Sequence, residues 1–171
     1  MKKKVLLAYS GGLDTSYCLI YLQSLGYEVH TALADTGGFT KEELDVLATK
    51  ANKLGAASHQ VLNIVEEYYQ EGIRFLLYGN VLKNQAYPLS VSAERVFQAR
   101  AIARLANHLN VDAIAHGSTG AGNDQVRFDL VFQALCPGKE IIAPIREKKL
   151  SREEEIQFLK EHKVDMNFDK A

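Results

Sequence analysis

Two adjacent glycines, Gly11 and Gly12, lie between a short apolar run, Val5–Leu7, and a segment with a helical pattern. This context predicts a strand that turns directly into a helix, with a backbone free to adopt positive φ and no side chain between its amides and a ligand. Hydroxyl groups nearby add donors, and the N–H groups at a helix start favour negative charge. The pattern predicts a phosphate-binding turn formed by Ala8, Tyr9, Ser10, Gly11, Gly12, Leu13, Asp14, Thr15 and Ser16.

The glycine spacing excludes the two commonest phosphate motifs. A P-loop needs G-x-x-x-x-G-K-[ST] and a dinucleotide fingerprint needs G-x-G-x-x-G, and this turn has neither the lysine nor the spacing. The remaining pattern, S-G-G-x-D-[ST], resembles the PP-loop of the N-type ATP pyrophosphatases. Those enzymes hold the β- and γ-phosphates as a unit and direct attack at the α-phosphate. A glycine-rich turn between strand and helix that binds nothing is the alternative interpretation.

Composition limits the classes of partner. The 171-residue chain carries 20 Lys and Arg against 21 Asp and Glu, so its charge gives no argument for nucleic acid or a membrane surface. No segment reaches the ~18 consecutive apolar residues of a membrane span. Cys18 and Cys136 form no C-x-x-C pair and are expected as free buried thiols. We expect one cytoplasmic nucleotide-binding domain over residues 1–171, without nucleic-acid or membrane partners.

Hydrophobic periodicity alternates between strand and helix along the chain. Capping boxes, Thr40 with Glu43 and Ser151 with Glu154, mark the starts of two helices. The pattern predicts an α/β fold, a doubly wound parallel sheet of five strands with helices on both faces. Ligands of such folds bind at the carboxyl ends of the strands. Four strands are expected at residues 5–7, 28–35, 58–63 and 111–115, and helices at 15–25, 40–54, 66–78, 93–107 and after 151.

Two strand-end or loop segments supply further candidates. Ala34 lies at the end of a predicted strand and precedes a Gly-Gly pair, where a small side chain and flexible backbone leave room for adenine or ribose. An ordinary turn is the alternative there. Tyr87 and Ser92 lie in a non-helical connection before the helix at 93–107 and can hold a polar substrate group. Ser92 can equally be the N-cap of that helix, and the two roles are compatible.

The segment after residue 115 concentrates polar side chains. Three glycines expose backbone amides, and Thr119, Asn123, Asp124 and Arg127 gather at the entry to a helix. Asn123, Asp124 and Arg127 fall within one turn and can point towards the same pocket. An Asp accepts from an ammonium while Thr, Asn and Arg donate to a carboxylate, so the group suits a zwitterion. The alternatives are that Asp124 only caps the helix and that Arg127 is a surface residue.

These segments together resemble the argininosuccinate synthase family. The resemblance rests on the phosphate turn, on Tyr87-Pro88-Leu89, on His116-Gly117, on Gly122–Phe128 and on Ile142–Glu147, in the order of the family. It implies an adenine nucleotide alpha hydrolase-like fold and an ATP-dependent ligase of arginine biosynthesis. The citrulline ureido oxygen would attack the α-phosphorus and expel pyrophosphate, and the aspartate amine would then displace AMP. Catalysis of this kind depends on alignment and on charge stabilisation at the phosphates.

The resemblance also implies roles for individual residues. ATP would be held by the turn at residues 8–16, with Ala34 and Gly117 near the adenosine. Mg²⁺ would be carried by the ATP phosphates, and no residue is assigned as a metal ligand or as a catalytic group. The full-length family forms homotetramers. Citrulline would be contacted by Tyr87, Ser92, Asn123 and Arg127, and aspartate by Thr119, Asn123 and Asp124.

Two features depart from the family. The family commonly reads Tyr-Pro-Leu-Gly-Thr-Ser where this chain has Ser90 and Val91 after Tyr87-Pro88-Leu89, which suggests a citrulline derivative, such as an N-acylated one, as the ureido substrate. Equal or better turnover of plain citrulline by the full-length enzyme would count against this. The family is also more than twice as long. We therefore expect a truncated ATP-binding part without the second domain, ending at 166–171, which binds ATP weakly and turns over little.

Two other function classes keep the phosphate turn. Another PP-loop enzyme, for RNA thiolation or amidation, would need a sulfur-relay cysteine pair, a basic face or a glutaminase partner, and the sequence shows none of them. A non-catalytic adenine-nucleotide sensor would need the turn alone. Replacing Asp124 with Ala separates a sensor from a synthase, because only the synthase would lose aspartate binding.

Overall fold

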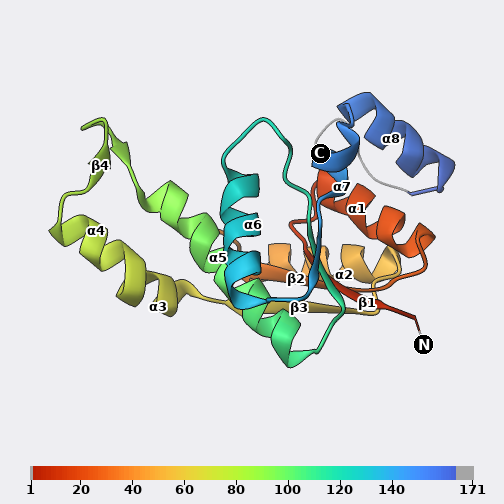
Figure 1. The fold of residues 1–171 in the computed structure, drawn as a ribbon, viewed down its shortest axis with the longest axis horizontal. Coiled ribbons are helices and arrows are strands. Elements are labelled where there is room, and N and C mark those ends of the chain that lie inside the picture. The colour runs from red at the N-terminus through yellow and green to blue at the C-terminus, as the bar shows by residue number, and fades with distance from the viewer. Residues whose placement is uncertain (1, 165–171) are drawn as a thin grey trace.

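The computed structural model describes residues 2–164, and the predicted chain end at 166–171 lies outside them. Five parallel strands form one sheet in the order β3-β2-β1-β6-β7, which confirms the predicted α/β architecture (Figure 1). β1 is at the centre, with β2 and β6 as its neighbours. The strands are β1 (Lys4–Ala8), β2 (Glu28–Asp35), β3 (Ser58–Asn63), β6 (Ala113–His116) and β7 (Glu140–Ile142).

The central strand is buried on both faces. Val5 and Leu7 pack into one hydrophobic cluster, whereas Leu6 packs into a second cluster on the opposite face. This alternation follows from the two-residue period of a strand, and the near-continuous apolar sequence of β1 is what a sheet covered on both faces requires. The chain therefore folds around β1.

Helices cover both faces of the sheet. The cluster that contains Val5 also takes residues from α1 (Leu13–Ser24), α2 (Lys41–Lys53), α7 (Pro144–Lys148) and α8 (Arg152–Glu161). The opposite cluster is formed with α5 (Ser90–His108) and α6 (Asp124–Leu135). In Figure 1, α1 and α8 lie side by side, and α3 and α4 lead to the β4 hairpin at the other end of the molecule. Among residues 2–164 no helix is long and apolar enough to cross a membrane.

Local sequence signals account for two helix starts. Thr40 and Glu43 form the predicted capping box at α2, and Ser151 and Glu154 form the one at α8. Each box satisfies N–H groups that the first helical turn leaves without partners. The Ser92 N-cap alternative is wrong, because α5 begins at Ser90 and the Ser92 hydroxyl accepts a hydrogen bond from Arg127 instead.

Two further expectations are corrected. Asp124 is the first helical residue of α6 rather than its cap, because Asn123 takes the cap position and makes no side-chain capping bond. The helix predicted at 66–78 is divided into α3 (Val65–Tyr68), a π-helical turn η1 (Tyr69–Ile73) and α4 (Arg74–Tyr78). An unpredicted antiparallel hairpin follows, formed by β4 (Leu82–Lys83) and β5 (Tyr87–Pro88).

Strand order fixes where a ligand can enter. The chain runs from β1 through β2 to β3 on one side, and then returns to place β6 on the other side of β1. The carboxyl ends of β1 and β6 therefore flank the point at which the winding direction reverses. Helices leave these two strand ends in different directions, and the crevice between them is the usual ligand site of open α/β sheets.

Candidate nucleotide-binding site

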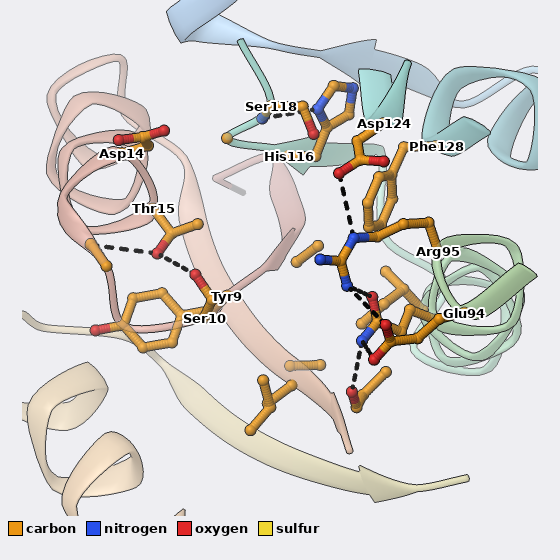
Figure 2. A pocket seen from close by; sticks show the side chains of 18 of the residues that line it. Tyr9, Ser10, Asp14, Thr15, Glu94, Arg95, His116, Ser118, Asp124 and Phe128 are labelled. Atoms are coloured by element: carbon orange, nitrogen blue, oxygen red, sulfur yellow. Dashed lines mark hydrogen bonds and ion pairs between the residues drawn. The ribbon is translucent and has the colours of Figure 1, made fainter. Parts of the chain in front are cut away.

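A cavity of about 580 Å³ opens at this reversal point. Its wall is made by the segments that follow β1, β2 and β6, and by side chains of α5 and α6 (Figure 2). The volume is in the range of small-molecule and cofactor sites. Tyr9 forms part of the wall, and burial raises the pKa of its phenol to about 12.

The corner between β1 and α1 is built on Gly11. Its φ is +77°, in the left-handed region, and a Cβ placed there would lie 2.1 Å from Leu47 Cδ2 of α2. Only glycine satisfies both conditions without strain. Gly12 follows with extended φ and ψ as the residue before α1, and it makes no side-chain capping bond. The start of α1 is consequently open towards the cavity.

Six consecutive amides at this corner have no partner among the residues that the structure describes. Within residues 2–164, the backbone N–H groups of residues 10 to 15 donate to no backbone or side-chain acceptor, and the first bond of α1 runs from Ser16 N to Gly12 O over 3.0 Å. Unpaired N–H groups at a helix start, together with the helix dipole, form a site for an anion. The amides at this end of the cavity are therefore placed to donate to an anion.

The hydroxyls at this corner differ in availability. Ser10 Oγ and Thr15 Oγ1 lie 3.4 Å apart, and both residues line the cavity. The Ser16 hydroxyl is fully buried and donates to Gly12 O at 2.7 Å, so it supports the corner from within and does not face the cavity. Ser10 and Thr15 are thus the hydroxyl donors that a bound anion would meet.

Gly117, after β6, packs directly on the start of α1. A Cβ on Gly117 would lie 3.1 Å from Thr15 Cγ2 and 3.3 Å from the Thr15 nitrogen. Such contacts are tighter than ordinary van der Waals packing, so a larger residue would displace one of the two segments. The segments after β1 and β6, predicted to share one sheet edge, are in contact there.

His116 anchors the segment after β6, a role that sequence reasoning missed. The Ser118 N–H donates to His116 Nδ1 at 3.2 Å, so the ring proton is on Nε2, which donates to Asp129 Oδ1 at 2.9 Å. Arg146 donates to the other oxygen of Asp129, and the His116 ring stacks on Phe128. Burial lowers the pKa of His116, against the opposing effect of Asp129.

A network of charged side chains lies between α5 and α6. Asp124 accepts from Arg127 Nη1 at 2.6 Å and from Arg95 Nε at 3.2 Å, and Arg127 also donates to Ser92 Oγ at 3.1 Å. Figure 2 shows the Arg95 guanidinium between Asp124 and Glu94. Glu94 in turn accepts from Thr36 Oγ1 at 2.6 Å. The network therefore connects α6 through α5 to the end of β2, and sequence reasoning identified neither Arg95 nor Glu94.

The predicted site residues fall into four groups. Arg127 and Ser92 are off the wall but hydrogen-bonded in the Asp124 network, whereas Tyr87, Thr119 and Asn123 are exposed and off the wall. Gly11 and Ser16 support the corner from behind. The residues on the cavity wall are Ala8, Tyr9, Ser10, Gly12, Leu13, Asp14, Thr15, Ala34, Gly117 and Asp124.

Asp14 has a buried carboxyl neighbour that the sequence did not predict. Glu155 of α8 is 4% exposed, and burial together with the nearby Asp14 raises the pKa of its carboxyl to about 7. Within residues 2–164 no group of three or more His, Cys, Asp and Glu side chains is arranged to hold a metal ion. Asp14 is on the cavity wall and belongs to the run of unpaired amides at residues 10 to 15, so it places a carboxylate at this end of the cavity.

Comparison with known proteins assigns the chain to a family. Residues 4–165 match the model described as the arginosuccinate synthase N-terminal HUP domain. The chain belongs to the argininosuccinate synthase family. It is 44% identical to argininosuccinate synthase of Bacillus cytotoxicus over 163 residues, and 38% identical to that of Staphylococcus aureus strain JH9 over 167 residues. The predicted family resemblance is confirmed.

The matches cover nearly all of this chain but less than half of its relatives. They span 95% of this chain and 40% of the Bacillus cytotoxicus protein, and 98% and 41% for the Staphylococcus aureus protein. A solved structure described as a predicted subunit of tRNA methyltransferase from Methanocaldococcus jannaschii matches with a TM-score of 0.55 at 14% identity, over 93% of this chain and 75% of that one. That likeness supports the fold alone.

Proposed function

We propose that this chain binds ATP through the β1–α1 corner and forms the nucleotide-binding part of an ATP-dependent carbon–nitrogen ligase. The run of unpaired amides at residues 10 to 15 carries the proposal, because a polyphosphate satisfies several such groups at once. The names of the relatives support the same assignment: each is an argininosuccinate synthase. The reaction would join citrulline, or an N-acylated citrulline, to aspartate with release of AMP and pyrophosphate.

The rest of the cavity suits the nucleoside. Ala32, Leu33 and Ile102 contribute apolar wall against which a purine can pack, and Phe39 adds an aromatic ring. Ala34, at the end of β2, leaves space near this wall. With phosphates at the corner and the base against the apolar wall, the α-phosphate would lie between them, towards Arg95 and Asp124.

The protein residues would act by binding ATP and the amino-acid substrates and by aligning them for reaction. The corner amides would bind the β- and γ-phosphates and stabilise the charge that develops as pyrophosphate leaves. Asp124 already accepts from two arginines, and its carboxylate has lone pairs left for the aspartate ammonium. Arg127, which is off the cavity wall, would contact citrulline as the family resemblance implies. Mg²⁺ would neutralise phosphate charge when carried by the bound ATP, with Asp14 as a neighbouring carboxylate on this wall.

Substitution of Gly117 tests the proposal. Gly117→Val puts side-chain atoms against Thr15, so we expect the affinity for ATP and pyrophosphate to fall by about tenfold or more, since small displacements of a binding loop are costly. Isothermal titration of this chain with ATP, and displacement of ATP by pyrophosphate, measure the effect. The matched control is Gly120→Val, where a Cβ meets nothing closer than Arg146 Cγ at 3.8 Å. Failure of wild-type protein to bind ATP or pyrophosphate would refute the proposal.

A further inference from the structure

The phosphate corner contains no cationic residue of its own. Residues 8–16 include no Lys or Arg. One cation that contacts the corner comes from α2, where Lys50 Nζ donates a hydrogen bond to the carbonyl oxygen of Gly11. Leu47, one turn earlier on α2, is the side chain that limits the space at Gly11. Residues three apart share a helix face, so a single face of α2 contacts the corner through both residues.

We propose that Lys50 is a positioning residue of the phosphate corner, which directs the Gly12 amide to the terminal phosphates. The inference rests on the proposed function. The C=O of Gly11 and the N–H of Gly12 belong to one planar trans peptide and point in opposite directions. Lys50 fixes the carbonyl on the α2 side, so the amide is turned away from α2. Gly12 is on the cavity wall and Lys50 is not, which agrees with this orientation.

The charge of Lys50 strengthens the same peptide. A carbonyl that accepts from an ammonium is polarised, and the N–H of that peptide becomes a better donor. Lys50 is partly buried, and among residues 2–164 no carboxylate forms an ion pair with it. Burial lowers the pKa of its ammonium. A polyphosphate on the opposite side of the corner would supply the missing negative charge.

Affinity measurements with Lys50 variants test the role. In Lys50→Met we expect the affinity of the chain for ATP and for inorganic tripolyphosphate to fall by about ten- to a hundredfold, the range for losing a charged hydrogen bond. Adenosine affinity should stay within about twofold, because the nucleoside end is untouched. Lys50→Arg should recover most of the loss. Lys53→Met, on the same helix but exposed, is the control and should bind like wild type.

A spectroscopic measurement separates positioning from simple support of the fold. The Lys50 ammonium should titrate at higher pH when tripolyphosphate is bound, followed by NMR of the Lys50 side chain, and Lys53 should not respond. Equal binding by Lys50→Met and wild type, or an unchanged Lys50 titration on binding, would overturn the inference and leave ATP binding intact. Parallel loss of adenosine and tripolyphosphate affinity would overturn it too. If wild type binds no polyphosphate, the proposed function fails, and this inference fails with it.

Discussion

At the scale of single residues, His116 connects the candidate site to the core. Its Nε2 proton is held by Asp129 and its Nδ1 accepts from Ser118, so the imidazole must be neutral to keep both bonds. Protonation of Nδ1 would remove the acceptor for the Ser118 amide, next to Gly117. The conformation of the segment after β6 is therefore linked to the protonation of one buried side chain.

His116 predicts a loss of stability in mild acid. The folded-state pKa is lowered below 6.5 by burial, so the unfolded chain takes up a proton that the folded chain does not. The contribution of His116 to the free energy of unfolding should therefore fall as the pH drops through 6.5, and should be constant above it. Glu155 changes the free energy of unfolding in the opposite direction over part of this range, so the fall is measured by comparing wild type with His116→Gln, whose amide offers one donor and one acceptor, in urea at pH 7.5 and pH 5.5. On going from pH 7.5 to pH 5.5, wild type should lose stability relative to His116→Gln.

His108 provides the control for that measurement. It lies in α5 and is exposed, so His108→Gln should keep the pH dependence of wild type. The groups that face the His116 ring, Asp129, Arg146 and Glu147, are unchanged in both variants. An identical change in the free energy of unfolding of wild type and His116→Gln between pH 7.5 and 5.5 would contradict the prediction.

At the scale of elements, the helix starts and the strand that depend on residues close in sequence were predicted correctly. The capping residues of α2 and α8 and the apolar run of β1 depend on neighbours a few positions away. The π-helical turn η1 was missed because it depends on distant packing: a Cβ on Gly72 would lie 2.9 Å from the Phe97 ring of α5. The two-residue strands β4 and β5 are too short to leave a periodic pattern.

The capping box of α2 gives a prediction about this element. Thr40 Oγ1 accepts from Glu43 N at 3.2 Å, and Glu43 accepts from Thr40 N at 2.8 Å. Thr40→Ala removes the first bond and should lower the free energy of unfolding by about 1 kcal/mol, measured by urea denaturation. Thr49→Ala is the matched control within the same helix, because its exposed hydroxyl only bonds back to Asp45 O. It should be neutral or slightly stabilising; equal losses in both variants would contradict the capping role.

At the scale of the whole molecule, the location of the site could be predicted from the sequence better than the residues that form it. Ligands of parallel sheets bind at the carboxyl ends of the strands, so the residues after β1 and β6 could be predicted to share one site before any contact was known. Arg95 and Asp124 are 29 residues apart, and Arg146 and Asp129 are 17 apart, so their contacts required the folded chain. Tyr87 was placed near the site by resemblance, but its hairpin keeps it off the cavity wall.

The buried carboxyl of Glu155, beside Asp14, gives a prediction for the stability of the whole chain. Glu155 lies between α8 and α1, where burial, then Asp14, raise its pKa to about 7, with Arg152 acting in the opposite direction. The folded state therefore binds a proton between pH 4.5 and about 7 that the unfolded state has released. Stability from this group is complete below pH 4.5 and is lost as the pH rises towards 7.

Glu155→Gln tests this loss because glutamine keeps the shape and cannot ionise. Its free energy of unfolding should exceed that of wild type by about 2 kcal/mol at pH 8, and the difference should shrink towards pH 5. Thermal and urea denaturation without nucleotide measure both conditions. Glu153→Gln, exposed on the same helix, should follow wild type at each pH. A difference between Glu155→Gln and wild type that stays constant from pH 5 to pH 8 would contradict the raised pKa of Glu155.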